Sequence, residues 1–368
     1  MYKVSMLLAA LVLSAACSDS ESGMEPEEFG ELGRGVIILC EGNFNAGNST
    51  LSYYNPETRE VENGVFRRAN GGARLGDTGQ SVSIHDGVAY VAMENSGVIW
   101  ALDTATFKVK GKLEAGDTEH MINPRYIHFV SDGKAYVTDL YSPYITVFNP
   151  KTMQYVGSIP TRQEASGGYA STEEMHRWGN RVFVNCWSYS NKILVVDVTK
   201  DEVTDEIVLD SWQPKSMVMD RRGKLWVVTD GGYSTGEDAF GDNVPHLYRI
   251  DAETLEVEQD QTLDVDEANV QLAVNPDSTQ LYLINNDIYR MSITAPHVPV
   301  RPFIEAERGA DGRRHYLYGI GVNPRNGELY VADAVDYRQS GVVYRYTAEG
   351  VLVDKFRVGI TPNGFAFQ

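Results

Sequence analysis

The stretch "SDGKAYVTDLYSPYITVFNPKTMQYVGSI", residues 131–159, contains three short apolar runs separated by turn residues. An Asp-Gly pair at Asp132 precedes the run centred on Tyr136, and an Asn-Pro pair at Asn149 ends the second run. Short runs rich in Val, Ile, Thr, Tyr and Phe, bounded by Gly, Pro, Asn and Asp, are typical of β-strands joined by tight turns. The stretch therefore predicts three consecutive antiparallel strands.

This unit recurs along the chain, each time with a large apolar residue at the centre of its first strand. These anchors are Ile38, Tyr90, Tyr136, Phe183, Trp226, Tyr282 and Tyr330. Successive anchors are 52, 46, 47, 43, 56 and 48 residues apart, and the longest spacing contains an insertion over residues 231–246. A repeat of about 40–50 residues with several short strands is typical of propeller blades. The sequence therefore predicts an all-β fold, a seven-bladed β-propeller.

A further short strand precedes each anchor except the first. Examples are "INPRYIHF" from Ile122 and "WQPKSMVM" from Trp212, whereas in the first unit residues 31–34 lead directly into Gly35. The chain ends with "ITPNGFAF" from Ile360, which aligns with both examples through the proline. We predict a propeller over residues 35–368 in which this C-terminal strand closes the first blade and removes the exposed sheet edges. An open β-solenoid, the alternative, has no need for that strand.

The first 34 residues are predicted to lie outside the fold. Residues 1–16 carry one early charge, an apolar stretch and small residues before Cys17. This resembles a bacterial lipoprotein signal, which would leave Cys17 lipidated at the mature N-terminus; a plain secretory signal is the alternative. Residues 17–34 are then the lipidated Cys and an acidic flexible tether. The acidic cluster resembles the surface-export signal of Bacteroidetes lipoproteins, and an ordinary solvated linker is the alternative.

The charge balance and the cysteines restrict the partners. Acidic residues outnumber basic ones by 51 to 32, which gives a net charge of −19. Such a surface repels phosphate backbones and anionic headgroups, so we predict no nucleic-acid partner and membrane contact through the lipid anchor only. Cys40 and Cys186 lie in apolar strand-like runs. They are predicted to be buried free thiols rather than a disulfide.

The repeat places two sets of loops on one face of the ring: those that lead into the innermost strands and those that join the second and third strands. These loops are long and rich in Tyr, Trp, Asn, Ser and Gly, a mixture that combines stiff amphipathic surface with adaptable hydrogen bonding. Since function tends to concentrate on loops, we predict a ligand-binding rim there; packing of the aromatics between blades is the alternative. The predicted ligand-binding residues are Phe44, Asn123, Arg125, Tyr126, Tyr141, Tyr169, Trp187, Tyr189, Trp212, Tyr233, Tyr337 and Asn363.

A ring of polar residues is predicted where the second strands end. Its members are Glu41, Glu94, Asp139, Asp230, Asn285 and Asp333. Ca²⁺ accepts such ligands, as in lactonase-type propellers, but Asp and Asn at strand ends also bond their own backbone, and residues spread around a ring cannot all reach one ion. We therefore predict turn capping and no metal.

Nucleophile chemistry is poorly supported by the sequence. It contains no H-E-x-x-H motif and no paired motif that places a base beside a Ser or Cys, so we predict that the protein is not an enzyme. The repeat places three histidines, His85, His128 and His176, near the ends of innermost strands. Their recurrence indicates positions set by the repeat.

Together these features resemble the BtuG-type surface lipoproteins of Bacteroidetes, a group of YncE-like β-propellers. The resemblance rests on Cys17, the acidic tether and the blade repeats, and it runs from "GVIILCEGN" at Gly35 to the C-terminal "ITPNGFAFQ". It implies a protein on the outer face of the outer membrane that captures cobalamin (vitamin B12) or another corrinoid. The ligand would be passed to a TonB-dependent outer-membrane transporter as cargo, with no cofactor.

No short motif in this sequence is diagnostic of cobalamin, so the resemblance transfers no individual binding residue. Fold alone does not determine function. A metal-dependent, lactonase-like propeller hydrolase and a protein- or glycan-binding module remain the alternatives at this point.

Overall fold

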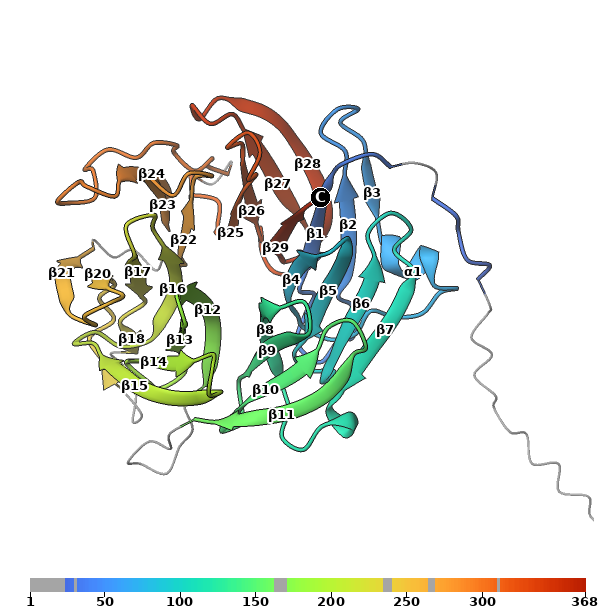
Figure 1. The fold of residues 1–368 in the computed structure, drawn as a ribbon. Helices are drawn as coiled ribbons and strands as arrows, with labels where there is room; N and C mark the ends of the chain where they lie inside the picture. Colours follow the sequence, from blue (N-terminus) through green and yellow to red (C-terminus); the bar gives the residue numbers. More distant parts are fainter. Residues whose placement is uncertain (1–23, 30–31, 162–170, 234–239, 264–268, 310–311) are drawn as a thin grey trace, which may run out of the picture.

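The computed structural model of the protein describes residues 24–29, 32–161, 171–233, 240–263, 269–309 and 312–368, which consist almost entirely of β-strands and their connections. Seven antiparallel sheets are arranged as blades around a central channel (Figure 1). The repeat-based prediction of a seven-bladed β-propeller is confirmed. In each blade the strands follow chain order from the channel outward, except that the first blade begins with the last strand of the chain.

Each of the first four blades contains four strands, ordered from the channel outward. They are β29 (Pro362–Phe367), β1 (Val36–Cys40), β2 (Thr50–Tyr54) and β3 (Val61–Asn63); β4 (Gly79–His85), β5 (Val88–Met93), β6 (Val98–Asp103) and β7 (Val109–Glu114); β8 (Pro124–Ser131), β9 (Lys134–Asp139), β10 (Tyr144–Asn149) and β11 (Gln154–Pro160); β12 (Thr172–Trp178), β13 (Arg181–Cys186), β14 (Lys192–Asp197) and β15 (Glu202–Val208).

The remaining three blades follow the same order. They are β16 (Pro214–Met219), β17 (Lys224–Thr229), β20 (His246–Asp251) and β21 (Val257–Thr262); β22 (Val270–Val274), β23 (Gln280–Asn285) and β24 (Asp287–Ser292); β25 (Leu317–Val322), β26 (Leu329–Asp333), β27 (Ser340–Tyr346) and β28 (Leu352–Ile360). The insertion in the fifth blade forms a small hairpin of β18 (Gly232–Tyr233) and β19 (Phe240–Gly241). A short helix, α1 (Val65–Ala69), follows β3, and a 3₁₀ turn covers Ala115–Asp117.

The C-terminal strand closes the ring as predicted. β29 pairs antiparallel with β1, with Val36 opposite Phe367 and Ile38 opposite Phe365. Figure 1 shows this dark red strand beside the blue start of the propeller. On its other side β25 approaches closely, since a Cβ added at Gly321 would lie 2.8 Å from the Cβ of Phe365. Glycine therefore makes room for the closing strand.

The core is divided among the interfaces between neighbouring blades. Tyr90 belongs to the buried cluster that joins blades two and three, and Trp226 to the cluster that joins blades five and six. Each anchor is at most 3% exposed, so each large side chain is removed almost fully from water, worth about 2 kcal/mol or more apiece. The aromatic repeat thus joins each blade to the next.

The first blade departs from the predicted alignment by one residue. Ile38 lies in the cluster between blades seven and one, together with Tyr330, whereas Ile37 lies in the cluster toward blade two. There Ile37 pairs with Tyr53, which supplies the aromatic ring. Because strand side chains alternate between faces, a slip of one residue reverses the face. In the first blade no turn joins the two innermost strands, such as Asp86-Gly87 in the second blade, to fix the alignment, so the placement of Ile38 as an anchor was wrong.

The acidic segment before the propeller is partly packed, which corrects the prediction of a wholly flexible tether. Phe29 makes an edge-on ring contact with Phe107 at 5.8 Å, and Arg68 of α1 pairs with Glu27 at 2.6 Å. The Tyr53 hydroxyl donates to the carbonyl of Leu32 at 2.9 Å. One aromatic side chain and one carboxylate are sufficient to bring this polar segment against the first two blades.

Cys40 and Cys186 are buried, and neither forms a disulfide with another described residue, as predicted. Among the described residues no helix has both the length and the apolar character needed to cross a membrane.

Candidate ligand-binding site at the channel mouth

A pocket of about 430 Å³ opens at the end of the channel where the inner strands begin. Every inner strand contributes to its wall, which explains why the pocket requires a closed ring. We call it the mouth pocket. One lining residue from each inner strand suffices to define it: Gln80 from β4, Arg125 from β8, Glu173 from β12, Lys215 from β16, Gln271 from β22, Tyr318 from β25 and Asn363 from β29.

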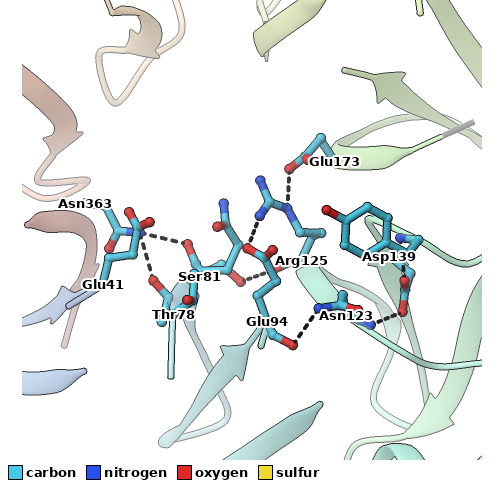
Figure 2. Close-up of polar contacts among 12 residues, drawn as sticks. Glu41, Thr78, Ser81, Glu94, Asn123, Arg125, Asp139, Glu173 and Asn363 are labelled. Atoms are coloured by element: carbon cyan, nitrogen blue, oxygen red, sulfur yellow. Dashed lines mark hydrogen bonds and ion pairs between the residues drawn. The ribbon is translucent and has the colours of Figure 1, made fainter. Parts of the chain in front are cut away.

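Arg125 is the central group of the mouth pocket. Its Nε donates to Glu173 Oε2 at 2.9 Å and its Nη1 donates to Glu94, so one guanidinium bridges two carboxylates from the neighbouring blades (Figure 2). All three side chains are buried, Arg125 at 8% exposure and Glu173 at 4%. The backbone carbonyl of Arg125 accepts a hydrogen bond from Ser81 Oγ at 2.6 Å. The network therefore joins the inner ends of three blades.

Two further carboxyls line the pocket without an ion pair to Arg125. Glu41 accepts a hydrogen bond from the Tyr318 hydroxyl at 3.0 Å, and Glu174 accepts from the backbone N–H of Met217 at 2.7 Å. Burial raises the pKa of both, that of Glu174 to about 7. Burial disfavours the charged form because little water is left to solvate it.

Lys215 is the other cation of the mouth pocket. Its ammonium lies 4.3 Å from the centroid of the Trp187 indole ring, a cation–π contact. The same indole donates from Nε1 to Asp230 Oδ2 at 3.0 Å. Asp230 therefore binds the edge of the Trp187 indole, and Lys215 contacts its face.

Two acceptor atoms in the wall of the pocket are unsatisfied. Glu173 Oε1 and Asn363 Oδ1 are buried and receive no hydrogen bond from any part of the chain that the structure describes. The amide nitrogen of Asn363 is in use, since it donates to the carbonyl of Gly79 at 2.9 Å (Figure 2). A buried acceptor without a donor costs free energy that a ligand can recover.

The polar ring of the rim divides into two kinds of residue. Asp139 Oδ2 accepts the N–H groups of Ile122 and Asn123, and Oδ1 those of Tyr141 and Ser142. Asp230 and Asp333 likewise accept the N–H two residues further on. Turn capping is therefore confirmed for these three aspartates, whereas Glu41 and Glu94 instead line the mouth pocket.

Residues 34–365 match the sequence family described as a domain of unknown function, DUF5074. The chain belongs to the DUF5074 family. No curated protein matches this DUF5074 chain.

Solved structures similar to the DUF5074 chain share its fold. A quinonprotein alcohol dehydrogenase-like protein from Bacteroides thetaiotaomicron has a TM-score of 0.69 at 15% identity, over 91% of this chain and 78% of that one. Hydrazine synthase from Kuenenia stuttgartiensis gives 0.61 at 14% identity, over 78% and 88%. A streptogramin B lyase structure gives 0.59 at 13% identity, over 78% and 86%. At these identities the likeness concerns the fold alone.

The predicted ligand-binding residues of the DUF5074 chain fall into three groups. Those that line the mouth pocket are Phe44, Arg125, Tyr126, Trp187 and Asn363. Asn123 lies behind the wall, where its side-chain nitrogen donates to the carbonyl of Glu94 at 3.3 Å. The other side chains described lie away from the pocket lining, namely those of Tyr141, Tyr189, Trp212 and Tyr337. Tyr169, the side chain of Tyr233 and the predicted lipidation site Cys17 lie outside the described part of the chain.

The aromatics away from the lining have different surroundings. Tyr337 packs edge-on against the pocket residue Tyr318 at 5.6 Å. The Trp212 carbonyl accepts the N–H of Gly231 at 3.1 Å, beside the β18–β19 hairpin. Tyr141 and Tyr189 are exposed on their loops. Tyr318 and Tyr337 both belong to the seventh blade, so this contact lies within one blade and not between blades.

Sequence reasoning found Arg125, Tyr126 and Asn363 but missed other wall residues that lie within the inner strands. Glu173, Glu174 and Lys215 occupy strands β12 and β16, and Tyr318 occupies β25. The available signal was the pair of adjacent glutamates in "STEEMH" from Ser171, since charged residues are rarely buried in a strand without a specific partner.

Proposed function

We propose that this DUF5074 protein is a lipid-anchored surface protein that binds cobalamin or a related corrinoid across the channel mouth and passes it to a TonB-dependent outer-membrane transporter. Binding and release suffice for this role, without catalysis. The proposal combines the resemblance of the sequence to BtuG-type lipoproteins with the character of the mouth face.

The observation that carries the proposal is the exposed aromatic surface around a polar pocket. Phe44, Tyr141 and Tyr189 are 69%, 57% and 63% exposed on loops of one face. Large aromatic side chains held in water are typical of ligand-contact surfaces. Phe44 also lines the mouth pocket itself.

A corrinoid suits such a surface because it is large, roughly flat and rimmed with amides. It exceeds the pocket of about 430 Å³, so it would lie across the mouth with part of its periphery inside. Trp187 and Phe44 would contact the ring edges, while Gln80, Gln271 and Asn363 offer amide partners. Many contacts on rigid strands favour slow release.

Calorimetry with cyanocobalamin, haem and a glycan panel tests the proposal on the soluble chain. We expect tight binding of cyanocobalamin alone, and a loss of about tenfold in affinity for Phe44→Ala and for Trp187→Ala. The matched control is Val351→Ala, an exposed apolar residue in a turn at the opposite end of the propeller, which should bind normally. No heat of binding at micromolar concentration would contradict the proposal, and binding of a glycan instead would favour a glycan-binding module.

Lipidation has a separate test. Labelled palmitate should be incorporated into the full chain expressed in a Bacteroidetes host and not into Cys17→Ser, and protease added to intact cells should remove the wild-type protein. A wild-type chain that takes up no label would overturn the anchor.

A further inference from the structure

The mouth pocket is rich in acceptors. Four carboxyls line it, namely Glu41, Glu94, Glu173 and Glu174, whereas its cations are Arg125 and Lys215. Arg125 is already engaged by Glu94 and Glu173. Besides Lys215, whose ammonium faces the Trp187 indole, the charged groups of the lining that remain to meet a ligand are carboxyl oxygens that accept hydrogen bonds.

One of these oxygens is buried with nothing to satisfy it. Glu173 is 4% exposed and lines the pocket, and its Oε1 receives no hydrogen bond from the described residues although its Oε2 is held by Arg125. Asn363 Oδ1, also in the wall, is in the same condition. A ligand group that donates N–H bonds would satisfy them, whereas a ligand carboxylate would add a further acceptor and a like charge.

We propose that the mouth pocket receives a primary amide of the ligand and rejects a carboxylate in the same place. This inference rests on the proposed corrinoid function and specifies it further: the protein would distinguish a fully amidated corrinoid from one that still carries a peripheral acid. Repulsion by like charge in a buried site gives specificity by exclusion as well as by contact.

The test compares cyanocobalamin with derivatives changed at one peripheral side chain. One series carries the monocarboxylic acid and the other the neutral N,N-dimethylamide, which has no N–H to donate. For at least one position around the ring we expect both derivatives to bind at least tenfold more weakly than cyanocobalamin, and the acid to be the weaker. If every acid binds as tightly as cyanocobalamin, the inference is wrong while the corrinoid function stands. If cyanocobalamin itself does not bind, both are wrong.

Substitutions in the pocket test which of its carboxyl groups weaken the binding of the acid. Glu173→Gln should reduce the ratio of the affinities for cyanocobalamin and for its monocarboxylic acid several-fold. The glutamine side chain can donate a hydrogen bond to the ligand carboxylate, and the substitution removes one negative charge from the pocket. Since Glu173 also holds Arg125, Glu174→Gln provides a second variant whose partners are Ser216 and Met217. Glu349→Gln removes one exposed charge in a turn at the opposite end and should leave the penalty unchanged. Melting curves establish that each variant is folded; an undiminished penalty in both folded pocket variants would overturn the assignment.

Discussion

The two ends of the channel use the same inner strands in different ways. β8 and β12 present Arg125 and Glu173 at the mouth, and three residues further along each they carry His128 and His176. Burial lowers the pKa of both histidines to about 4, while it raises the pKa of Glu174 at the mouth to about 7. For these three groups burial therefore shifts the pKa toward the neutral form at both ends of the channel.

What differs is the pairing of charge. At the mouth a buried guanidinium pairs with the carboxyl groups of two glutamates from neighbouring blades. At the opposite end His85 stacks on Phe129 at 4.4 Å, and the nearby Asp86 and Asp132 lie in exposed turns. Among the described residues these three bring ligand atoms close enough together for a cation, but Lys151 already pairs with Asp132 at 3.1 Å. The proposed binding site therefore lies at the mouth, where the charged side chains are buried and paired, whereas the described acidic residues of the opposite end lie in exposed turns.

Removing the strand that both ends share should have the largest effect. β29 places Asn363 at the mouth, and the chain then ends with Gln368 at the other end, where its side-chain nitrogen donates to the carbonyl of Thr104 at 2.6 Å. Deletion of residues 360–368 opens the ring and exposes two inner strands, which should cost more than about 5 kcal/mol, the scale of a whole domain's stability. Calorimetric melting measures this, with deletion of Gln368 alone as the mild control. Unchanged melting after the longer deletion would rule out the closed ring.

Breaking the charge pairing at the mouth should come next. Arg125→Met leaves Glu94 and Glu173 buried without a cation and should destabilise the fold by about 3–5 kcal/mol. Lys215→Met is the control, because Lys215 rests on an indole face; its expected cost is below about 1 kcal/mol. Urea denaturation of both variants gives the comparison. Equal effects would show that the Arg125 network is not what holds the mouth together.

The pH dependence of stability separates the carboxyl from the histidines. The ordinary pKa of Glu174 is 4.5 and its folded value is about 7; the stability that its protonated form provides is complete below about pH 4.5 and is lost as pH rises through about 7. Relative to the wild type, Glu174→Gln should therefore gain roughly 2 kcal/mol of stability between pH 5 and 8. Denaturation midpoints of both proteins across that range test this, and a difference between them that does not change with pH would contradict the raised pKa of Glu174.

On the acid side the sign is reversed. For His128 and His176 the folded pKa of about 4 lies below the ordinary 6.5, so the stability contributed by the neutral rings is complete above about pH 6.5 and is lost as pH falls through about 4. Glu174→Gln should not change this loss of stability at low pH.

The smallest effect is expected from the exposed end. Asp132→Asn should change neither the melting temperature nor the affinity for cyanocobalamin, because its pairing with Lys151 is exposed to water. Calorimetric titration of this variant sharpens the contrast between the ends. A tenfold loss of affinity in this variant would indicate that the ligand binds at the opposite end of the channel.

The sequence predicted the blades well because their signal is local. Tight turns and large apolar anchors recur along the sequence at intervals of 43 to 56 residues. The first unit lacks an inner strand and the C-terminus has one to spare, so the sequence also predicts how the ring closes. Ile38 was misplaced because the first unit lacks the turn that sets its register. Such a slip exchanges the two faces of a strand without altering its composition.

The site was only partly predictable. Phe44 and Trp187 lie on loops whose composition marks them, whereas Glu173 and Lys215 lie within strands. Whether such a side chain points into the channel depends on how seven inner strands pack around it, which no local pattern encodes. The one-residue shift of the first blade also matters here, because it aligns Glu41 with Leu140 and not with Asp139. Glu41 and Leu140 both line the pocket, whereas Asp139 caps a turn.

The most direct test of the account is the position of the cobalt atom in crystals grown with cyanocobalamin. Anomalous scattering at the cobalt edge locates that atom independently of the protein phases. We predict a single strong peak over the channel mouth, beside Phe44 and Trp187. A cobalt peak at the His85 end of the channel, or no cobalt peak in crystals grown with cyanocobalamin, would contradict the account.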